Sequence, residues 1–238
     1  MRAVPLPRYG GTLQHMAGPV KSQTVTTTRR YDSPARRAKA QETEAKILDA
    51  AAALFAERGY VATSLAAVAE RAGVNARTVY KVFGTKVRLL SRFVDVAIVG
   101  DQEAIPVAER SWAEAAFNAR TGRERVRAYA AAIRRVMSSA GPAFRVAAQA
   151  AADVDAAALW AVGQRLRLED STAFVAALHD AHLLRRGSSR REAVATVWLI
   201  TAPETFTQLN DGLGWTLDQY ERWINRMLVD ALLDPAAT

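Results

Sequence analysis

The sequence predicts an all-α protein, and three observations carry this prediction. Apolar residues recur at spacings of three and four from Gln41 onward, which is the period of an amphipathic helix. Gly, Pro, Asn and Asp residues separate these stretches, as expected at helix ends. Half of the 238 residues are hydrophobic, enough to fill one large or two small cores. We expect a small helical domain at 41–101 and a larger one at 102–238.

The first forty residues differ from the rest in charge. They hold eight basic residues and one acidic residue, Asp32, and so carry seven of the chain's eight net positive charges. Without a hydrophobic period, such a segment buries too little surface to offset its ordering entropy. We therefore expect 1–40 to be a disordered basic tail. Its charge suits a polyanion; the alternative is an unselected extension, with Met16 as the true start.

The first predicted helix covers 42–58. Its apolar face consists of Ile47, Ala51, Leu54 and Phe55, and Gly59 can adopt the left-handed conformation that ends a helix. A short second helix is predicted at 64–71, since Thr63 and Ser64 offer N-cap oxygens and Gly73 stops the pattern.

A third, equally short helix is predicted at 75–82. Asn75 is a good N-cap, and Val74 with Val79 forms a hydrophobic staple that turns Val79 inward. Two short helices joined by a tight Gly-containing turn, behind a longer helix, form the helix-turn-helix arrangement, whose second short helix enters the DNA major groove. Helical hairpins also occur as plain packing units, so spacing alone leaves both interpretations open.

The residues left pointing outward favour DNA. They combine hydroxyls, a phenol and cations, which suit a phosphate backbone; they are Arg77, Thr78, Tyr80, Lys81 and, at the start of the next helix, Lys86. Arg77 is the natural base reader, since a guanidinium can make a bidentate contact to guanine.

The stretch from Ile47 to Leu90 resembles the DNA-binding domain of TetR-family transcriptional regulators. The resemblance rests on F-x-x-x-G-Y at 55–60, the Ala-Thr-Ser start of the second helix, A-x-R-A-G-V at 69–74, T-V-Y-x-x-F at 78–83 and Lys86. It implies a helix-turn-helix DNA-binding domain whose contact residues match these positions: Thr63 and Ser64 for phosphate, Asn75 at the helix start, Ala76 and Arg77 in the groove, and Thr78, Tyr80, Lys81 and Lys86 on the backbone. Val82 departs from the family, in which many members have His.

The remainder of the chain also shows helical patterns. Breaks at glycines and prolines outline helices near 85–99, 105–119, 123–139, 142–153, 155–184, 190–209 and 216–233. Large side chains among many alanines leave space for a ligand pocket, although ordinary core packing explains them as well; they are Trp112, Phe117, Tyr129, Phe144, Trp160 and Phe174. The resemblance implies a cavity whose small-molecule effector shifts the population of the protein off DNA.

The last two helices carry wider apolar faces than a small domain normally hides. The resemblance implies that two such helices from each subunit pack into a four-helix bundle and make a homodimer. The residues expected at that interface are Trp198, Thr201, Thr205, Leu209, Tyr220, Trp223, Ile224 and Met227. The alternative is that they fill the subunit's own core.

Composition and motifs argue against several other classes. The chain has no cysteine and only three scattered histidines, so we expect no metal site and no cofactor. No apolar run reaches the roughly 18 to 20 residues that span a bilayer, and a signal peptide is not evident. We expect a cytoplasmic protein without a membrane partner.

We expect a dimeric transcriptional repressor that binds a double-stranded DNA operator and is released by a small-molecule effector. One alternative is a DNA-binding regulator without a small ligand, either responsive to a protein or constitutive. A helical enzyme is a much weaker alternative, because the sequence shows neither a phosphate-binding loop nor a catalytic triad or carboxylate pair.

Overall fold

A computed structural model describes residues 34–99 and 111–234, and every regular element within these ranges is helical. The only β interaction among them is an isolated antiparallel bridge between Leu184 and Leu233. The prediction of an all-α protein is confirmed. The chain divides into two compact units at Phe93 and Val94, eight residues before the predicted boundary. Of the helices described, none is both long and apolar enough to cross a membrane.

The amino-terminal unit contains α1 (Pro34–Ala62), α2 (Leu65–Arg71), α3 (Ala76–Phe83) and the first turns of α4 (Lys86–Val99). Inside α1 the helical path is interrupted at Gly59, whose φ of +76° is the left-handed conformation expected there. The helices meet over fully buried apolar side chains, which include Ile47, Ala51, Val68, Val79, Leu89 and Leu90.

The start of α1 differs from the prediction. The helix begins at Pro34 rather than at residue 42, so residues 34–40 are helical and do not belong to a disordered tail. Residues 1–33, the rest of that segment, lie outside the described residues. The apolar pattern failed to mark this start because residues 35–42 are exposed.

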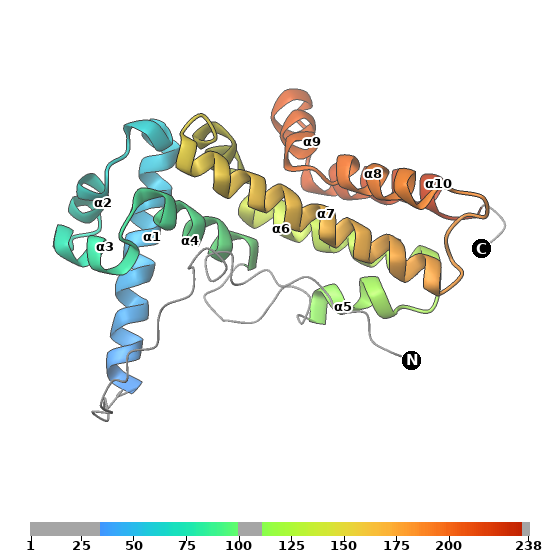
Figure 1. Ribbon diagram of the computed structural model, residues 1–238, viewed down its shortest axis with the longest axis horizontal. Helices are drawn as coiled ribbons and strands as arrows, with labels where there is room; N and C mark the ends of the chain where they lie inside the picture. Colours follow the sequence, from blue (N-terminus) through green and yellow to red (C-terminus); the bar gives the residue numbers. More distant parts are fainter. Residues whose placement is uncertain (1–33, 100–110, 235–238) are drawn as a thin grey trace, which may run out of the picture. The chain divides into compact units, whose positions relative to one another are not determined.

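The second unit is built on two long helices, α6 (Gly122–Ala150) and α7 (Val154–Asp180), which run beside one another (Figure 1). The short helix α5 (Ser111–Asn118) packs on α6. The carboxy-terminal part comprises α8 (Arg190–Ile200), α9 (Pro203–Thr207), a π-helical turn (Gln208–Gly212) and α10 (Leu217–Leu232). Of these, α10 packs on α6 and α8, and α8 packs on α7.

Side-chain caps explain where several of these helices begin. Thr121 and Glu124 form a reciprocal capping box at the start of α6, and Thr216 and Gln219 form another at the start of α10. Asp153 accepts hydrogen bonds from two backbone amides at the start of α7.

Two clusters of buried residues hold the second unit together. The larger one joins α6, α7, α8 and α10 and includes Val126, Phe174, Leu178, Val197 and Leu228. The smaller one joins α6, α9 and α10 through Ala130, Met137, Phe206, Tyr220 and Ile224.

The predicted break at Gly141–Pro142 is wrong, because α6 continues through both residues. Pro142 lies on the exposed side of the helix, as does Ser138, whose carbonyl loses its amide donor and can be hydrated instead. Gly141 has a packing role: a Cβ added there would lie 2.9 Å from Cε1 of Phe206. The glycine therefore lets α9 approach α6 closely.

Other helix ends also differ from the prediction. Residues 105–110 of a predicted helix lie outside the described residues. The helix expected at 155–184 ends at Asp180, and the one expected at 190–209 breaks before Pro203, which begins α9. Proline disfavours helical backbone in the residue before it, so a new helix starts there in a new direction.

Replacing Gly141 with Ala should lower the free energy of unfolding by about 1 to 3 kcal/mol, because the added methyl group collides with the Phe206 ring. Gly163→Ala in α7 is a matched control, since a Cβ there meets no atom within 4 Å. That control should gain about 0.5 to 1 kcal/mol from helix propensity. Urea unfolding of both variants measures the difference; equal effects would contradict the packing role of Gly141.

Candidate nucleic-acid interface

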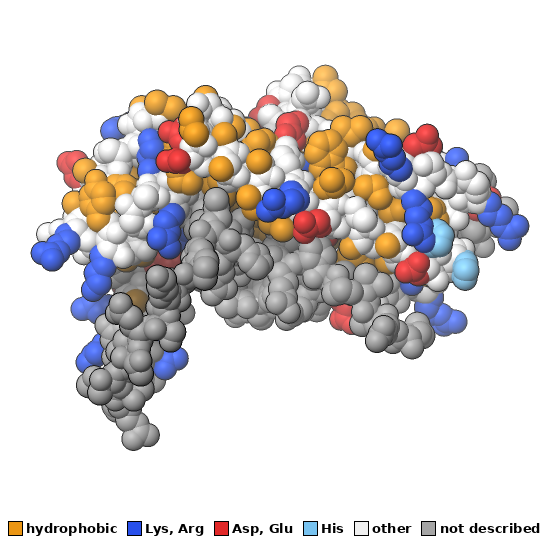
Figure 2. Space-filling model, viewed as in Figure 1, with side chains coloured by type: hydrophobic (Ala, Val, Ile, Leu, Met, Phe, Trp, Pro, Cys, Tyr) orange, Lys and Arg blue, Asp and Glu red, His pale blue; other side chains and the backbone are white. Residues whose placement is uncertain are grey.

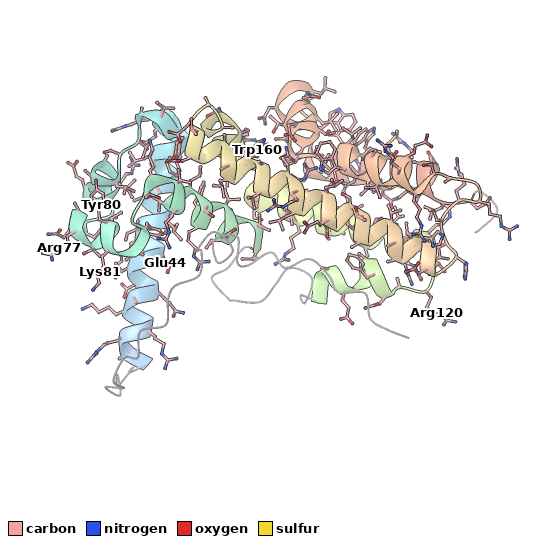
Figure 3. The ribbon with its side chains drawn as sticks, viewed as in Figure 1. Glu44, Arg77, Tyr80, Lys81, Arg120 and Trp160 are labelled. Atoms are coloured by element: carbon pink, nitrogen blue, oxygen red, sulfur yellow. The ribbon has the colours of Figure 1, made fainter. Side chains whose placement is uncertain are left out.

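Helix α3 is held so that one face is buried and the other is presented. Asn75 begins the helix by accepting a hydrogen bond from the amide of Arg77 at 2.8 Å. Val79 is fully buried and Phe83 is 5% exposed, so both turn toward the core. The opposite face carries Arg77, Tyr80 and Lys81, which point away from the unit (Figure 3). Tyr80 is 53% exposed, although a phenol ring ordinarily seeks burial.

The other residues predicted on α3 are also accessible. Ala76 is exposed in the first turn and Thr78 is half-buried. Val82 is 46% exposed and offers only an apolar surface to a partner. The exposed face of α3 therefore combines a guanidinium, an ammonium, a hydroxyl and a phenol with small apolar groups.

The two residues predicted as phosphate contacts at the start of α2, Thr63 and Ser64, differ in their exposure and in their hydrogen-bond partners. Ser64 is exposed and caps α2 by accepting a hydrogen bond from the amide of Ala67 at 3.1 Å, so its hydroxyl can still donate to a phosphate. Thr63 is only 2% exposed, and its hydroxyl donates to the carbonyl of Gly59 at 2.8 Å. The prediction of a phosphate contact for Thr63 is corrected: its side chain closes the end of α1.

Lys86 also has a structural partner. Its ammonium donates to the carbonyls of Tyr60 at 3.0 Å and Val61 at 3.3 Å, and lies 4.2 Å from the centre of the buried Tyr60 ring. An ammonium has three donors, so two are used inside the protein and one remains for a phosphate. Lys86 is therefore first a positioning residue that ties α4 to the end of α1.

Arg88, one turn into α4, was missed by the sequence analysis. It is exposed, and its Nη1 would lie 3.9 Å from a Cβ added at Gly84, so its guanidinium lies beside the turn between α3 and α4. Thr85 begins α4 by accepting a hydrogen bond from the amide of Arg88. The signal for Arg88 was a second cation directly after the Gly84 turn.

Ion pairs neutralise two cations that lie away from the exposed face of α3. Arg92 pairs with Glu44 at 2.6 Å, and Arg71 pairs with Glu57 at 2.7 Å. The hydrogen bond from Arg71 lowers the pKa of Glu57 below its ordinary value. Within the described part of the chain, Arg77 and Lys81 form no such pair, so their charges remain available to an external anion. Figure 2 shows cationic side chains along the edge of the amino-terminal unit on which α3 lies.

The aromatic residues predicted to line a pocket lie in different surroundings in the described part of the second unit. Tyr129 and Phe174 are buried and stack at 4.0 Å between ring centres, and Phe117 meets Phe174 edge-on. Phe144 packs against the smaller core cluster instead, and Trp160 is half-buried on α7. The side chain of Trp112 lies outside the described part of the structure. Four of the six, Tyr129, Phe174, Phe117 and Phe144, therefore belong to the two core clusters or pack against them.

A half-buried carboxyl group adjoins this aromatic stack. The Tyr129 hydroxyl donates to Asp170 Oδ2 at 3.0 Å. Burial raises the pKa of Asp170 to about 6, although the Tyr129 hydrogen bond and the charge of Arg167 act in the opposite direction. Its pKa is thus shifted toward neutral pH mainly by burial.

An apolar groove of about 540 Å³ lies between α7 and α8 in the second unit. It was not predicted. Its lining consists of Leu168, Thr172, Val175, Ala176, Arg190, Arg191, Val194, Ala195 and Trp198. Leu168 of this lining is 46% exposed, and Leu199 of α8 is 58% exposed, which is unusual for large aliphatic side chains.

The residues predicted at a dimer interface fall into two groups. Tyr220, Ile224 and Thr201 are at most 3% exposed; the first two belong to the smaller core cluster, and the Thr201 hydroxyl donates to the Val197 carbonyl. Their assignment to an interface is corrected. The others are at least partly accessible: Trp198, Thr205, Leu209, Trp223 and Met227. Trp223 meets Trp215 edge-on, and Leu209 packs at the edge of the smaller cluster.

Comparison with known proteins finds similarity over the helix-turn-helix. Residues 47–93 match the family model described as "Bacterial regulatory proteins, tetR family". The HTH-type transcriptional repressor Rv3405c of Mycobacterium tuberculosis and the regulator Mb3439c of Mycobacterium bovis are each 47% identical over 55 residues. These matches cover 23% of this chain and 29% of each relative, so the chain spans under a third of those relatives.

Solved structures resemble a larger part of the chain. NalD, the secondary repressor of the MexAB-OprM multidrug efflux pump of Pseudomonas aeruginosa, is 18% identical with a TM-score of 0.65, over 82% of this chain and 99% of that one. A SmeT–triclosan complex is 17% identical with a TM-score of 0.65, over 83% and 95%. At this level of identity the likeness establishes the fold.

Replacing Lys86 with Met should lower the free energy of unfolding by about 1 to 2 kcal/mol, because it removes two charged hydrogen bonds and the contact with the Tyr60 ring. Lys81→Met, at an exposed position, should leave stability within about 0.5 kcal/mol of wild type. Chemical denaturation followed by circular dichroism compares the two variants. Equal stability of both would remove the positioning role of Lys86.

Proposed function

We propose that this chain, whose residues 47–93 match the family model of tetR bacterial regulatory proteins, is a transcriptional repressor that binds an operator in double-stranded DNA as a homodimer. The observation that carries the proposal is the exposed face of α3. Its two cations lack an internal counter-ion among the described residues, while Arg71 and Arg92 of the same unit are paired.

Reading and positioning fall to different residues of this face. Arg77, in the first turn of α3, is suited to the O6 and N7 atoms of guanine. Lys81 lies one turn later, and Ser64 lies at the start of α2; an ammonium and a hydroxyl donate to phosphate oxygens whatever the sequence. Tyr80 adds a phenol to the same set. Such contacts fix the register of α3 in the major groove.

A second copy of the chain is the occupant that fits the apolar groove between α7 and α8. Leu199, which is 58% exposed, lies one helical turn beyond the lining residue Ala195 and so on the same face of α8. Trp198, which was predicted at the interface, lines it. Contiguous exposed apolar surface marks protein interfaces, and a two-fold dimer places two copies of α3 about 34–36 Å apart on one side of DNA.

Release by a small molecule completes the proposal. A repressor leaves DNA when its effector binds better to a conformation whose recognition helices are wrongly spaced. The structural neighbour SmeT is described in complex with triclosan, so triclosan is a suitable first probe. A compound that changes tryptophan fluorescence and also releases DNA supports this mechanism. A regulator that responds to a protein, or acts constitutively, would show neither effect with any compound.

Replacing Arg77 with Ala should reduce affinity for the selected operator about tenfold or more, since one bidentate base contact contributes about 1 to 3 kcal/mol of discrimination. Affinity for a scrambled duplex should change much less. Lys81→Met should weaken binding to both duplexes by the same factor. Fluorescence anisotropy measures all four affinities; equal loss on both duplexes for Arg77→Ala would contradict its reading role.

Replacing Leu199 with Glu should convert the dimer to a monomer at micromolar concentration, because it buries a charge in an apolar interface. Leu213→Glu is the matched control: Leu213 is 66% exposed and lies outside the groove lining, so that variant should remain dimeric. Sedimentation velocity distinguishes the two. A monomeric wild-type protein, or a dimeric Leu199→Glu variant, would refute the proposed interface.

A further inference from the structure

A buried hydroxyl group in the second unit has no hydrogen-bond partner among the described residues. It belongs to Tyr220 of α10, which is 1% exposed and packs edge-on against Phe206 at 5.0 Å between ring centres. Tyr129 is buried as well, but its hydroxyl donates to Asp170. A buried polar group without a partner costs free energy. The unpaired phenol of Tyr220 therefore favours a partner from outside the chain.

A second donor in the second unit is also unpaired. Trp198, near the end of α8, is half-buried, yet its indole nitrogen Nε1 is buried and has no hydrogen-bond partner among the described residues. An indole N–H can only donate. The same side chain lines the apolar groove between α7 and α8. Trp198 therefore contributes both to the groove and to a covered, unpaired donor.

Arg167 of α7 lies near both of these groups. Its guanidinium donates to the Trp198 carbonyl at 2.7 Å, and its central carbon lies 5.4 Å from the centre of the Trp198 ring. Burial raises the pKa of Tyr220, and the nearby charge of Arg167 acts in the opposite direction. Side chains of α7, α8 and α10 thus bring a phenol and an indole to the same guanidinium.

A row of polar side chains connects this guanidinium with the surface. Arg167 donates to Gln164 Oε1 at 2.5 Å, and the Gln164 amide donates to Glu204 Oε1 at 3.0 Å. Glu204, in the first turn of α9, is exposed. A small polar molecule can therefore approach Arg167 from solvent, between α7 and α9.

The unpaired groups define the chemistry of a ligand. The indole N–H only donates, the phenol can donate, and a guanidinium is a cation with five donors. Together they suit an anionic acceptor such as a carboxylate, since hydrogen bonds to ionised groups are the stronger ones. A cationic ligand would leave the indole N–H unpaired and would meet the charge of Arg167.

The charge of Arg167 alone does not select the ligand. Asp170 also lies near Arg167, whose charge opposes the rise in the pKa of Asp170 caused by burial, and Tyr129 donates to Asp170. The two unpaired donors therefore provide the selectivity. The other neighbours of Tyr220 are apolar, and the smaller core cluster includes Ile200, Phe206 and Leu209. They suit a ligand whose remaining part is apolar.

We propose that the effector is a small carboxylate with an apolar body, whose oxygens accept hydrogen bonds from the Tyr220 hydroxyl and the Trp198 N–H beside Arg167. This inference rests on the proposed function and names the class and the site of its effector. Because Trp198 also lines the groove of the proposed dimer interface, a ligand on its N–H changes that groove and with it the spacing of the two copies of α3.

The test removes one donor at a time from the full-length protein. Tyr220→Phe deletes the unpaired hydroxyl, and Trp198→Phe deletes the indole N–H but keeps an aromatic ring; sedimentation velocity checks that the latter is still dimeric. Tyr129→Phe is the matched control, because it deletes a buried hydroxyl whose acceptor is Asp170. Calorimetric titration measures the binding of benzoate, 2-naphthoate and octanoate, with benzylammonium and benzyl alcohol as the cationic and neutral counterparts of benzoate.

At least one of the three acids should bind the wild type and lower its affinity for the operator, and benzoate should bind more tightly than either of its counterparts. Tyr220→Phe and Trp198→Phe should each weaken binding about tenfold or more, the value of one hydrogen bond to a charged group. Tyr129→Phe should leave binding nearly unchanged. Without ligand, Tyr220→Phe should unfold at the same urea concentration as wild type or a higher one, whereas Tyr129→Phe should unfold at a lower one.

Four results would overturn the inference. They are a failure of all three acids to bind, binding that does not depend on Tyr220, equal affinity for benzoate and benzylammonium, and a loss of stability in Tyr220→Phe as large as in Tyr129→Phe. None of them affects operator recognition. A ligand-free wild-type protein that does not prefer its operator over a scrambled duplex would instead refute the proposed function.

Discussion

The carbonyl groups at the end of α1 are the constraint on which the exposed face of α3 depends. Helix ends leave carbonyls without intrahelical partners, and here Thr63 binds the one of Gly59 while Lys86 binds those of Tyr60 and Val61. Thr63 lies two residues before α2 and Lys86 is the first residue of α4. The carboxy-terminal end of α1 thus positions both α2, which precedes α3, and α4, which follows it. The orientation of α3 itself follows from the burial of Val79.

In the amino-terminal unit, the exposed face of α3 carries cations that have no ion-pair partner among the described residues. Two cations away from α3 are paired across helices, Arg71 with Glu57 and Arg92 with Glu44. These exposed or half-exposed pairs contribute little stability, but they leave the unpaired charge on α3. The second unit has the opposite character. Its groove between α7 and α8 is apolar, which suits association with another copy rather than with a nucleic acid.

Features encoded by neighbouring residues were predictable from the sequence. The N-caps Ser64 and Asn75, the break at Gly59 and the inward turn of Val79 all follow from local rules. Features set by tertiary contacts were not. Thr63 and Lys86 have the chemistry of phosphate ligands, yet their partners are carbonyls within the chain. Likewise, the apolar side chains of Tyr220 and Ile224 could not show that they pack against α6 and α9 of the same chain. Gly141 was predicted to end a helix because its packing partner, Phe206, lies 65 residues away in the sequence.

The most direct test of the account is an anisotropy titration of the purified wild-type protein against the DNA upstream of its own gene and against a scrambled duplex, at two salt concentrations. Sequence-specific regulators bind their sites at least about 10³ times more tightly than other DNA. We expect the protein to prefer the upstream DNA over the scrambled duplex by a factor of that size, also at the higher salt concentration. Two results together would contradict the proposed function: equal affinity for the upstream DNA and the scrambled duplex, with the same decrease at higher salt, and no tighter binding to any site obtained by genome-wide selection.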